Sequence, residues 1–121
     1  MSTVPLTHEV NVMPIIDFAV LAHLQAELPE DLYQELLALF LEQGGQRVMA
    51  IEQAIAEQDF AVLAHEIHAC VSEAATFGAM QLAALASHSN GLCRQGEKAQ
   101  AFAAAATIKP AWLLVYAELN K

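Results

Sequence analysis

A regular helical pattern runs through residues 59–78, which read Asp59-Phe-Ala-Val-Leu-Ala-His-Glu-Ile-His-Ala-Cys-Val-Ser-Glu-Ala-Ala-Thr-Phe-Gly78. An α-helix turns about 100° per residue, so one side of it would carry only apolar or small residues: Leu63, Ile67, Cys70, Ala74 and Phe77. The opposite side would carry His65, His68 and Ser72. The pattern therefore predicts a helix that buries one face in a core and presents two imidazoles on the other.

Both ends of this segment carry helix-boundary signals. Asp59 is a good N-cap candidate, because its carboxylate can accept hydrogen bonds from the free backbone N–H groups of the first turn. Gly78 marks a turn, since glycine adopts backbone conformations that other residues avoid. We therefore expect a helix from just after Asp59 to about Thr76.

The preceding segment predicts one long helix. Pro29 suits its first turn, and the two acids that follow favour the positive end of the helix dipole. Apolar or small residues then recur at steps of three and four, as one face kept in phase: Tyr33, Leu37, Phe40, Gly44, Val48, Ile51 and Ile55. Each residue of the pair Gly44-Gly45 costs about 1 kcal/mol against alanine, but the unbroken phase favours one helix, with any bend at this pair, over two helices.

Three further helical segments complete the chain. A short one covers residues 15–28, and another runs over residues 79–95, where Gly96 is a suitable stop. The last covers residues 97–119, and Pro110 should kink or split it.

The arrangement of these segments predicts the fold class. No segment alternates strictly between apolar and polar residues, and no Asn-Gly or Asp-Gly hairpin turn occurs. Several helices with short connections predict an all-α fold, an up-down antiparallel four-helix bundle with a short additional N-terminal helix. Residues 1–13 show no periodicity and are expected to form a flexible tail. Residues 14–121 would then form the bundle as a single domain.

The composition limits the classes of binding partner and the cellular compartment that we expect for this chain. The chain has 121 residues and a net charge of -9, which argues against nucleic acid and against an anionic membrane surface. Its first basic residue is Arg47, so no secretory signal or transit peptide is expected. We also expect no apolar run long enough to cross a bilayer. Cys70 and Cys93 form no C-x-x-C pair, and two free core thiols fit a reducing cytoplasm.

The histidine face allows three interpretations. The first is a solvated helix surface without chemistry. The second is a metal site, but His65-Glu66-Ile67-His68 is one residue short of the H-E-x-x-H spacing and no third ligand is evident, so no metal is expected. The third is a nucleophile toward phosphorus, because an imidazole on a rigid helix among small residues leaves room for a phosphoryl group and for the partner that carries it.

These features resemble the histidine-containing phosphotransfer (HPt) domain, a monomeric bundle that relays phosphoryl groups in multistep two-component signalling. The usual motif is Ala-His-x-Leu-Lys-Gly-Ser-Ala-x-x-x-Gly-Ala-x-x-Leu, with an Asp nine residues before the histidine. An ungapped match gives Asp59, His68, Ala74, Gly78, Ala79, Leu82 and Leu85. Upstream, Ile16-Asp17 and residues 36–41 and 51–55 resemble the first helices of the family, so the likeness covers about residues 15–119.

The match assigns the phosphoacceptor role to His68 and a structural turn to Gly78. Two positions depart from the motif, because the Lys and Gly that usually follow the histidine by three and four residues are Val71 and Ser72 here. The lysine offers positive charge to the phosphoryl group, which Val71 cannot do, whereas Ser72 is small and could hydrogen-bond. A rival register would put His65 at the active position, but it needs three extra residues before the glycine, so we prefer His68.

The resemblance implies a phosphocarrier without kinase activity of its own. His68 would relay a phosphoryl group between aspartates on the receiver domains of response regulators and hybrid sensor kinases. The chain would need no cofactor, since the receiver would supply Mg²⁺ and a catalytic Lys. His65, Val71, Ser72 and Ala75 would support the imidazole or form the docking surface of a cytoplasmic monomer. Two alternatives stay open: a module that binds receivers without being phosphorylated, and an unrelated structural or metal-binding bundle.

Overall fold

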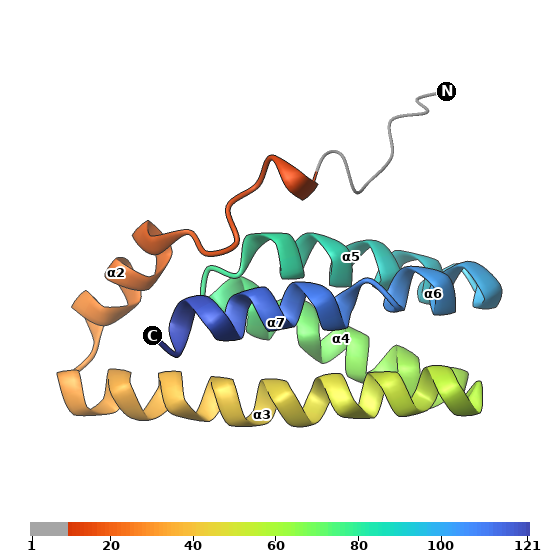
Figure 1. Ribbon diagram of the computed structural model, residues 1–121, viewed down its shortest axis with the longest axis horizontal. Helices are drawn as coiled ribbons and strands as arrows, with labels where there is room; N and C mark the ends of the chain where they lie inside the picture. Colours follow the sequence, from red (N-terminus) through yellow and green to blue (C-terminus); the bar gives the residue numbers. More distant parts are fainter. Residues whose placement is uncertain (1–9) are drawn as a thin grey trace.

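The computed structural model of the protein describes residues 10–121, and every regular element within them is a helix. The helices are α2 (Phe18–Glu27), α3 (Glu30–Glu57), α4 (Phe60–Thr76), α5 (Met80–Arg94), α6 (Lys98–Ala105) and α7 (Ile108–Leu119). Figure 1 shows α3, α4, α5 and the α6–α7 pair gathered in one elongated bundle, with the short α2 at one end. The expected up-down antiparallel four-helix bundle with a short N-terminal helix is confirmed.

The core consists of the apolar sides of the four long segments. The largest fully buried aliphatic side chains come from α3, α4, α5 and α7: Ile51, Leu63, Ile67, Leu82, Ile108 and Val115. Burying each such side chain contributes about 1.5–3 kcal/mol. Toward one end of the bundle, the ring of Phe40 stacks on Phe77 at 4.3 Å and meets Trp112 edge-on at 5.4 Å. This packing holds α4 in place with its histidine face outward.

The helix α3 is continuous over its 28 residues, as its apolar periodicity predicts. Gly44 lies inside it because α7 comes very close, so that a Cβ at this position would overlap the Trp112 ring. A Cβ at Gly45 would meet nothing within 4 Å. The first glycine therefore gives room to Trp112, and the pair does not interrupt the helix.

The helix α4 begins and ends where its sequence signals predict. The Asp59 carboxylate accepts a hydrogen bond from the Val62 N–H at 3.2 Å, which confirms the expected N-cap. Gly78 has a φ of +72°, and its carbonyl accepts a hydrogen bond from the Asp17 N–H at 2.7 Å. Residues 77–79 thus join α4 to α5 as antiparallel neighbours, and the segment before α2 is tied to this connection.

The last helical segment is divided as predicted, but four residues before Pro110. The helix α6 ends at Ala105 and α7 begins at Ile108, so the proline lies in the first turn of α7. A proline ring clashes with the carbonyl four residues earlier, here that of Ala106, and proline lacks an N–H. The division therefore falls where the proline prevents helical hydrogen bonding.

The same segment meets the length and composition of a membrane-crossing helix. Lys98–Leu119 has 22 residues and contains an 18-residue stretch with a mean hydropathy of 1.2. This finding differs from the expectation that no apolar run is long enough to cross a bilayer. A core helix of a soluble protein meets the same criterion. Here the segment is divided into α6 and α7, both of which pack against α3 and α5. Its composition alone therefore gives little support to a membrane span.

The expected tail, residues 1–13, lies mostly outside the described residues. Of its last four residues, Val10 is buried in the core. The Met13 carbonyl accepts a hydrogen bond from the Gln81 side chain at 2.7 Å. Contact with the bundle therefore begins by residue 10, before the expected domain boundary at residue 14.

Candidate functional site

The outer side of α4 carries the residues that the sequence pattern places there. His65, His68, Ser72 and Ala75 are all exposed. His68 lies near the middle of this 17-residue helix, so its imidazole projects from a rigid element. Val71 is partly buried and packs against the core. An apolar side chain thus occupies the position where the resemblance leads one to expect a lysine.

The Ser72 hydroxyl is engaged within its own helix. Its Oγ donates a hydrogen bond to the Ala69 carbonyl at 3.3 Å, and the Ser72 carbonyl accepts one from Thr76 Oγ1 at 2.8 Å. To bind a phosphoryl oxygen, the hydroxyl would have to leave Ala69. Ser72 therefore mainly keeps the surface one turn after His68 small.

A shallow hollow lies between α4 and α5 beside the histidines. Its lining comes from both helices: Ala64, His65, His68, Asn90, Cys93 and Arg94. Because α5 runs antiparallel to α4 after a short connection, the end of α5 lies beside the first half of α4. Arg94, exposed in the last turn of α5, is thereby brought to the same hollow as His68. The sequence identifies Arg94 only as a basic residue near a helix end. Nothing in its spacing from His68 predicts that the two side chains line the same hollow.

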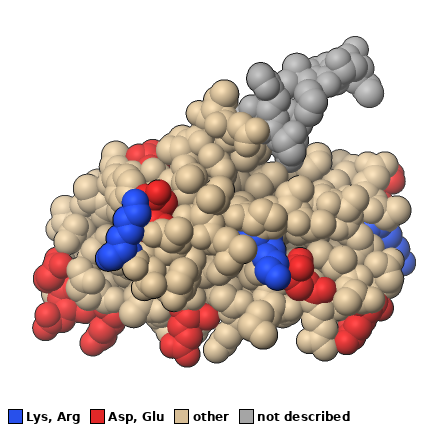
Figure 2. Space-filling view, viewed as in Figure 1, with Lys and Arg blue, Asp and Glu red and all other residues tan. Residues whose placement is uncertain are grey.

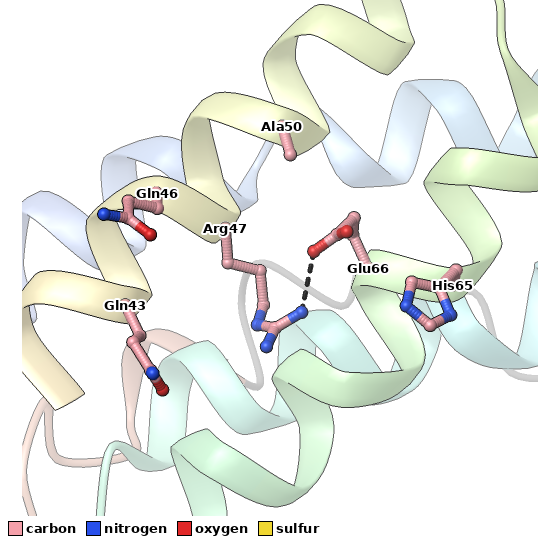
Figure 3. Close-up of a pocket in the computed structure, with 6 residues that line it drawn as sticks. All are labelled: Gln43, Gln46, Arg47, Ala50, His65 and Glu66. Carbon is pink, nitrogen blue, oxygen red and sulfur yellow. Dashed lines mark hydrogen bonds and ion pairs between the residues drawn. The ribbon is translucent and has the colours of Figure 1, made fainter. Parts of the chain in front are cut away.

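A second hollow lies on the α3 side of His65. Figure 3 shows Arg47 reaching from α3 toward Glu66, with His65 next to Glu66 on α4. Arg47 Nη1 donates to Glu66 at 2.7 Å, while its Nη2 and Nε donate to the two oxygens of Glu73 at 2.6 and 3.1 Å. The hydrogen bond to Glu73 is the main cause that raises the pKa of the Arg47 guanidinium. This cluster attaches α4 to α3 and compensates two acids on the histidine-bearing helix.

Comparison with known proteins shows to which family this bundle belongs. The family model for the Hpt domain matches residues 35–120. The chain belongs to the Hpt domain family. A solved structure similar to it is the crystal structure of histidine-containing phosphotransfer protein B (HptB) from Pseudomonas aeruginosa PAO1. The two are 27% identical with a TM-score of 0.80, over 88% of this chain and 92% of that one. A search of the curated proteins found no match.

Family membership confirms the resemblance and removes the unrelated bundle as an alternative. Hpt domains are phosphocarriers, so the general role of the chain is histidine phosphotransfer in a phosphorelay. Within residues 10–121, no group of three or more His, Cys, Asp or Glu side chains is arranged to hold a metal ion.

Positive charge is scarce on this Hpt domain. The chain has five Lys and Arg against fourteen Asp and Glu. Figure 2 shows acidic side chains along the α3 edge of one face, with few basic side chains on the same face. Since a phosphoryl group is anionic, the position of each cation relative to His68 matters.

Cys93, which lies beside the two histidines, is a poor nucleophile. Cys93 lines the hollow, but its side chain is mostly buried. Burial raises the pKa of the Cys93 thiol above its ordinary value. The thiolate is the reactive form of cysteine, so Cys93 is a poor nucleophile at neutral pH.

Proposed function

We propose that His68 is the phosphoacceptor of this Hpt domain. It takes a phosphoryl group from an aspartyl phosphate on one receiver domain and passes it to an aspartate on another. The observation that carries the proposal is the placement of His68, which is exposed in the middle of α4, opposite the core face. The partners are receiver domains of response regulators and hybrid sensor kinases.

The transfer is a substitution at phosphorus. A neutral ring nitrogen of His68 donates its lone pair to phosphorus, and the bond from phosphorus to the aspartate oxygen breaks. The aspartate leaves as a carboxylate, and the proton on the other ring nitrogen stays, so the phosphorylated ring carries a positive charge. Delivery to the second receiver reverses these steps. The receiver supplies Mg²⁺ and a catalytic Lys, so this chain acts without a cofactor and without kinase activity of its own.

The surface around His68 suits the approach of a receiver. Ala75 is small, Val71 offers partly exposed apolar surface, and Ser72 adds a short side chain. Small neighbours allow the close approach that in-line transfer requires. His65, one turn before His68, is placed to tune the imidazole or to contact the phosphoryl group. We assign these four residues to the docking surface of a cytoplasmic monomer.

Transfer of label from a phosphorylated receiver tests the assignment. Wild type and His65→Gln are expected to become labelled, whereas His68→Gln is not, because it lacks the nucleophile. His65→Gln is a matched control, since it removes an exposed imidazole from the same hollow. Label that persists in His68→Gln would refute the role of His68.

Val71 favours a second candidate function, a receiver-binding module that is not phosphorylated. The position three residues after His68 carries a partly buried apolar side chain, where the resemblance leads one to expect a lysine. In this case the docking surface would work and the chemistry would not. Tight binding of a receiver, with no acid-labile phosphohistidine by mass spectrometry or phosphorus NMR, would support this function over the first.

A further inference from the structure

The chain has few residues that could replace the missing positive charge beside His68. A bound phosphoryl group is stabilised by cationic hydrogen-bond donors, and Val71 provides none. All the basic side chains of the sequence lie within the described residues: Arg47, Arg94, Lys98, Lys109 and Lys121. The question is which of them can reach the phosphoryl group on His68.

Four of the five are engaged elsewhere or lie away from the hollow. Arg47 is held by two carboxylates of α4, and Lys121 pairs with a glutamate of α7 at 3.2 Å. Lys98 lies over a phenylalanine ring at 5.3 Å from its centre. Lys109 is in the first turn of α7 and does not line the hollow. Only Arg94 lines it together with His68.

The side chain of Arg94 is available for an anion. It is exposed, and no carboxylate within residues 10–121 forms an ion pair with it. It also lines a neighbouring hollow with Gly91 and Gln95, so it has open space on both sides. A guanidinium stays protonated throughout the physiological pH range and can donate two parallel hydrogen bonds to phosphate oxygens.

We propose that Arg94 binds the phosphoryl group on His68 and supplies from α5 the positive charge that α4 lacks. The inference rests on the proposed role of His68 as phosphoacceptor. The bonds made and broken are those of the transfer itself. Arg94 adds hydrogen bonds to the phosphoryl oxygens, which lowers the free energy of the transition state and of phosphohistidine.

Phosphoramidate tests Arg94 without a receiver, because it phosphorylates histidine directly as its own P–N bond breaks and ammonia leaves. In the Arg94→Gln variant, phosphoramidate is expected to phosphorylate His68 at least about tenfold more slowly than in wild type. This factor corresponds to the loss of one charged hydrogen bond. Arg94→Lys should keep most of the rate. Lys109→Gln removes the same charge elsewhere and should react like wild type. Equal rates for Arg94→Gln and wild type would overturn the proposal.

A rescue variant tests whether charge is what Arg94 supplies. In the Arg94→Gln background, Val71→Lys places a cation at the position of the family's lysine and is expected to restore most of the lost rate. Circular dichroism of each variant checks that the bundle is intact. A correctly folded double variant that stays as slow as Arg94→Gln would count against the proposal.

A phosphorylated receiver as donor separates this inference from the proposed function. If wild type takes no label at His68 from either donor, the proposed function fails. If wild type and Arg94→Gln are labelled at the same rate, phosphotransfer stands and the role of Arg94 fails. Affinity for the unphosphorylated receiver, measured by titration, should change much less than the transfer rate. A loss confined to that affinity would make Arg94 a docking residue and overturn the proposal.

Discussion

Cys70 lies two residues from His68 but on the opposite, buried side of α4. Its removal from water is the main cause that raises the pKa of its thiol to about 11, and the carboxylate of Glu73 adds to the effect. A thiol with this pKa is almost entirely protonated at neutral pH and therefore unreactive. Cys70 is thus a packing residue, and it links the stability of α4 to alkaline pH.

We predict that the free energy of unfolding falls between about pH 9 and pH 11. The ordinary pKa of the thiol is 9.0, and in the folded protein that of Cys70 is about 11. In this window the unfolded chain releases the proton and the folded chain keeps it, so rising pH favours unfolding. The loss is on the order of 3 kcal/mol, because two pKa units correspond to roughly twice 1.4 kcal/mol. Urea titrations at several pH values measure it, and Cys70→Ala should flatten the slope; an equal slope in the variant would contradict the prediction.

The residues around His68 differ in how far the sequence could predict them. His65 and Ser72 follow from helical periodicity, because residues three and four apart share one face. Arg94 does not, since it reaches the hollow only through the packing of α5 on α4. Arg47 is likewise separated in sequence from the carboxylates of α4 that it binds. Local patterns thus predicted the histidine face, whereas the charges that surround it depend on tertiary packing.

At the scale of single helices, the glycine pair of α3 shows two different environments side by side. Gly44 is buried against the Trp112 ring, and Gly45 faces open space. Only the first is needed for the packing of α7 on α3. The second carries the usual entropic cost of glycine in a helix without any gain in packing.

Alanine at these two positions should therefore have opposite effects. Gly44→Ala is expected to lower the free energy of unfolding by about 2–3 kcal/mol, because the added methyl group overlaps the indole. Gly45→Ala should raise it by about 0.5–1 kcal/mol through helix propensity. Thermal and urea unfolding followed by circular dichroism would measure both. A stabilising Gly44→Ala would show that α7 can move away from α3 at no cost.

Helix ends were predictable where a local signal exists. The N-cap at Asp59 and the glycines at positions 78 and 96 correspond to observed boundaries, because each acts through its own backbone. The division between α6 and α7 was predicted at Pro110 but occurs at residues 106–107. A proline disturbs the turn that precedes it, so the proline and the observed break are one turn apart. The burial of Val10 had no local signal, since it depends on contacts with the core.

At the scale of the whole molecule, the ion-pair cluster of Arg47 joins the longest helix to the helix that carries His68. The exposed fraction of the Arg47 side chain is 19%, and those of the Glu66 and Glu73 side chains are 21% and 30%. All three side chains are therefore largely shielded from solvent. Breaking a shielded cluster costs more than breaking a surface pair, because the remaining charges are left without a partner.

We expect Arg47→Met to lower the free energy of unfolding by about 1–3 kcal/mol. The substitution keeps an apolar stem against α4 but leaves the two carboxylates of the cluster uncompensated. Lys109→Met, which removes an exposed cation, serves as the control and should change stability by less than about 0.5 kcal/mol. Urea denaturation at low ionic strength measures both. Equal stabilities of the two variants would show that the cluster does not hold α4 on α3.

Trp112 is the only tryptophan in the chain, and it is buried at the contact of α7 with α3. Its fluorescence therefore reports whether the last helix is seated on the longest one. Trp112 is not among the residues that line the hollow beside His68. Trp112 is thus an intrinsic fluorescent probe for the packing of α7 on α3, and it is separate from the phosphotransfer site. Folding and phosphoryl labelling can therefore be followed independently, without an attached dye.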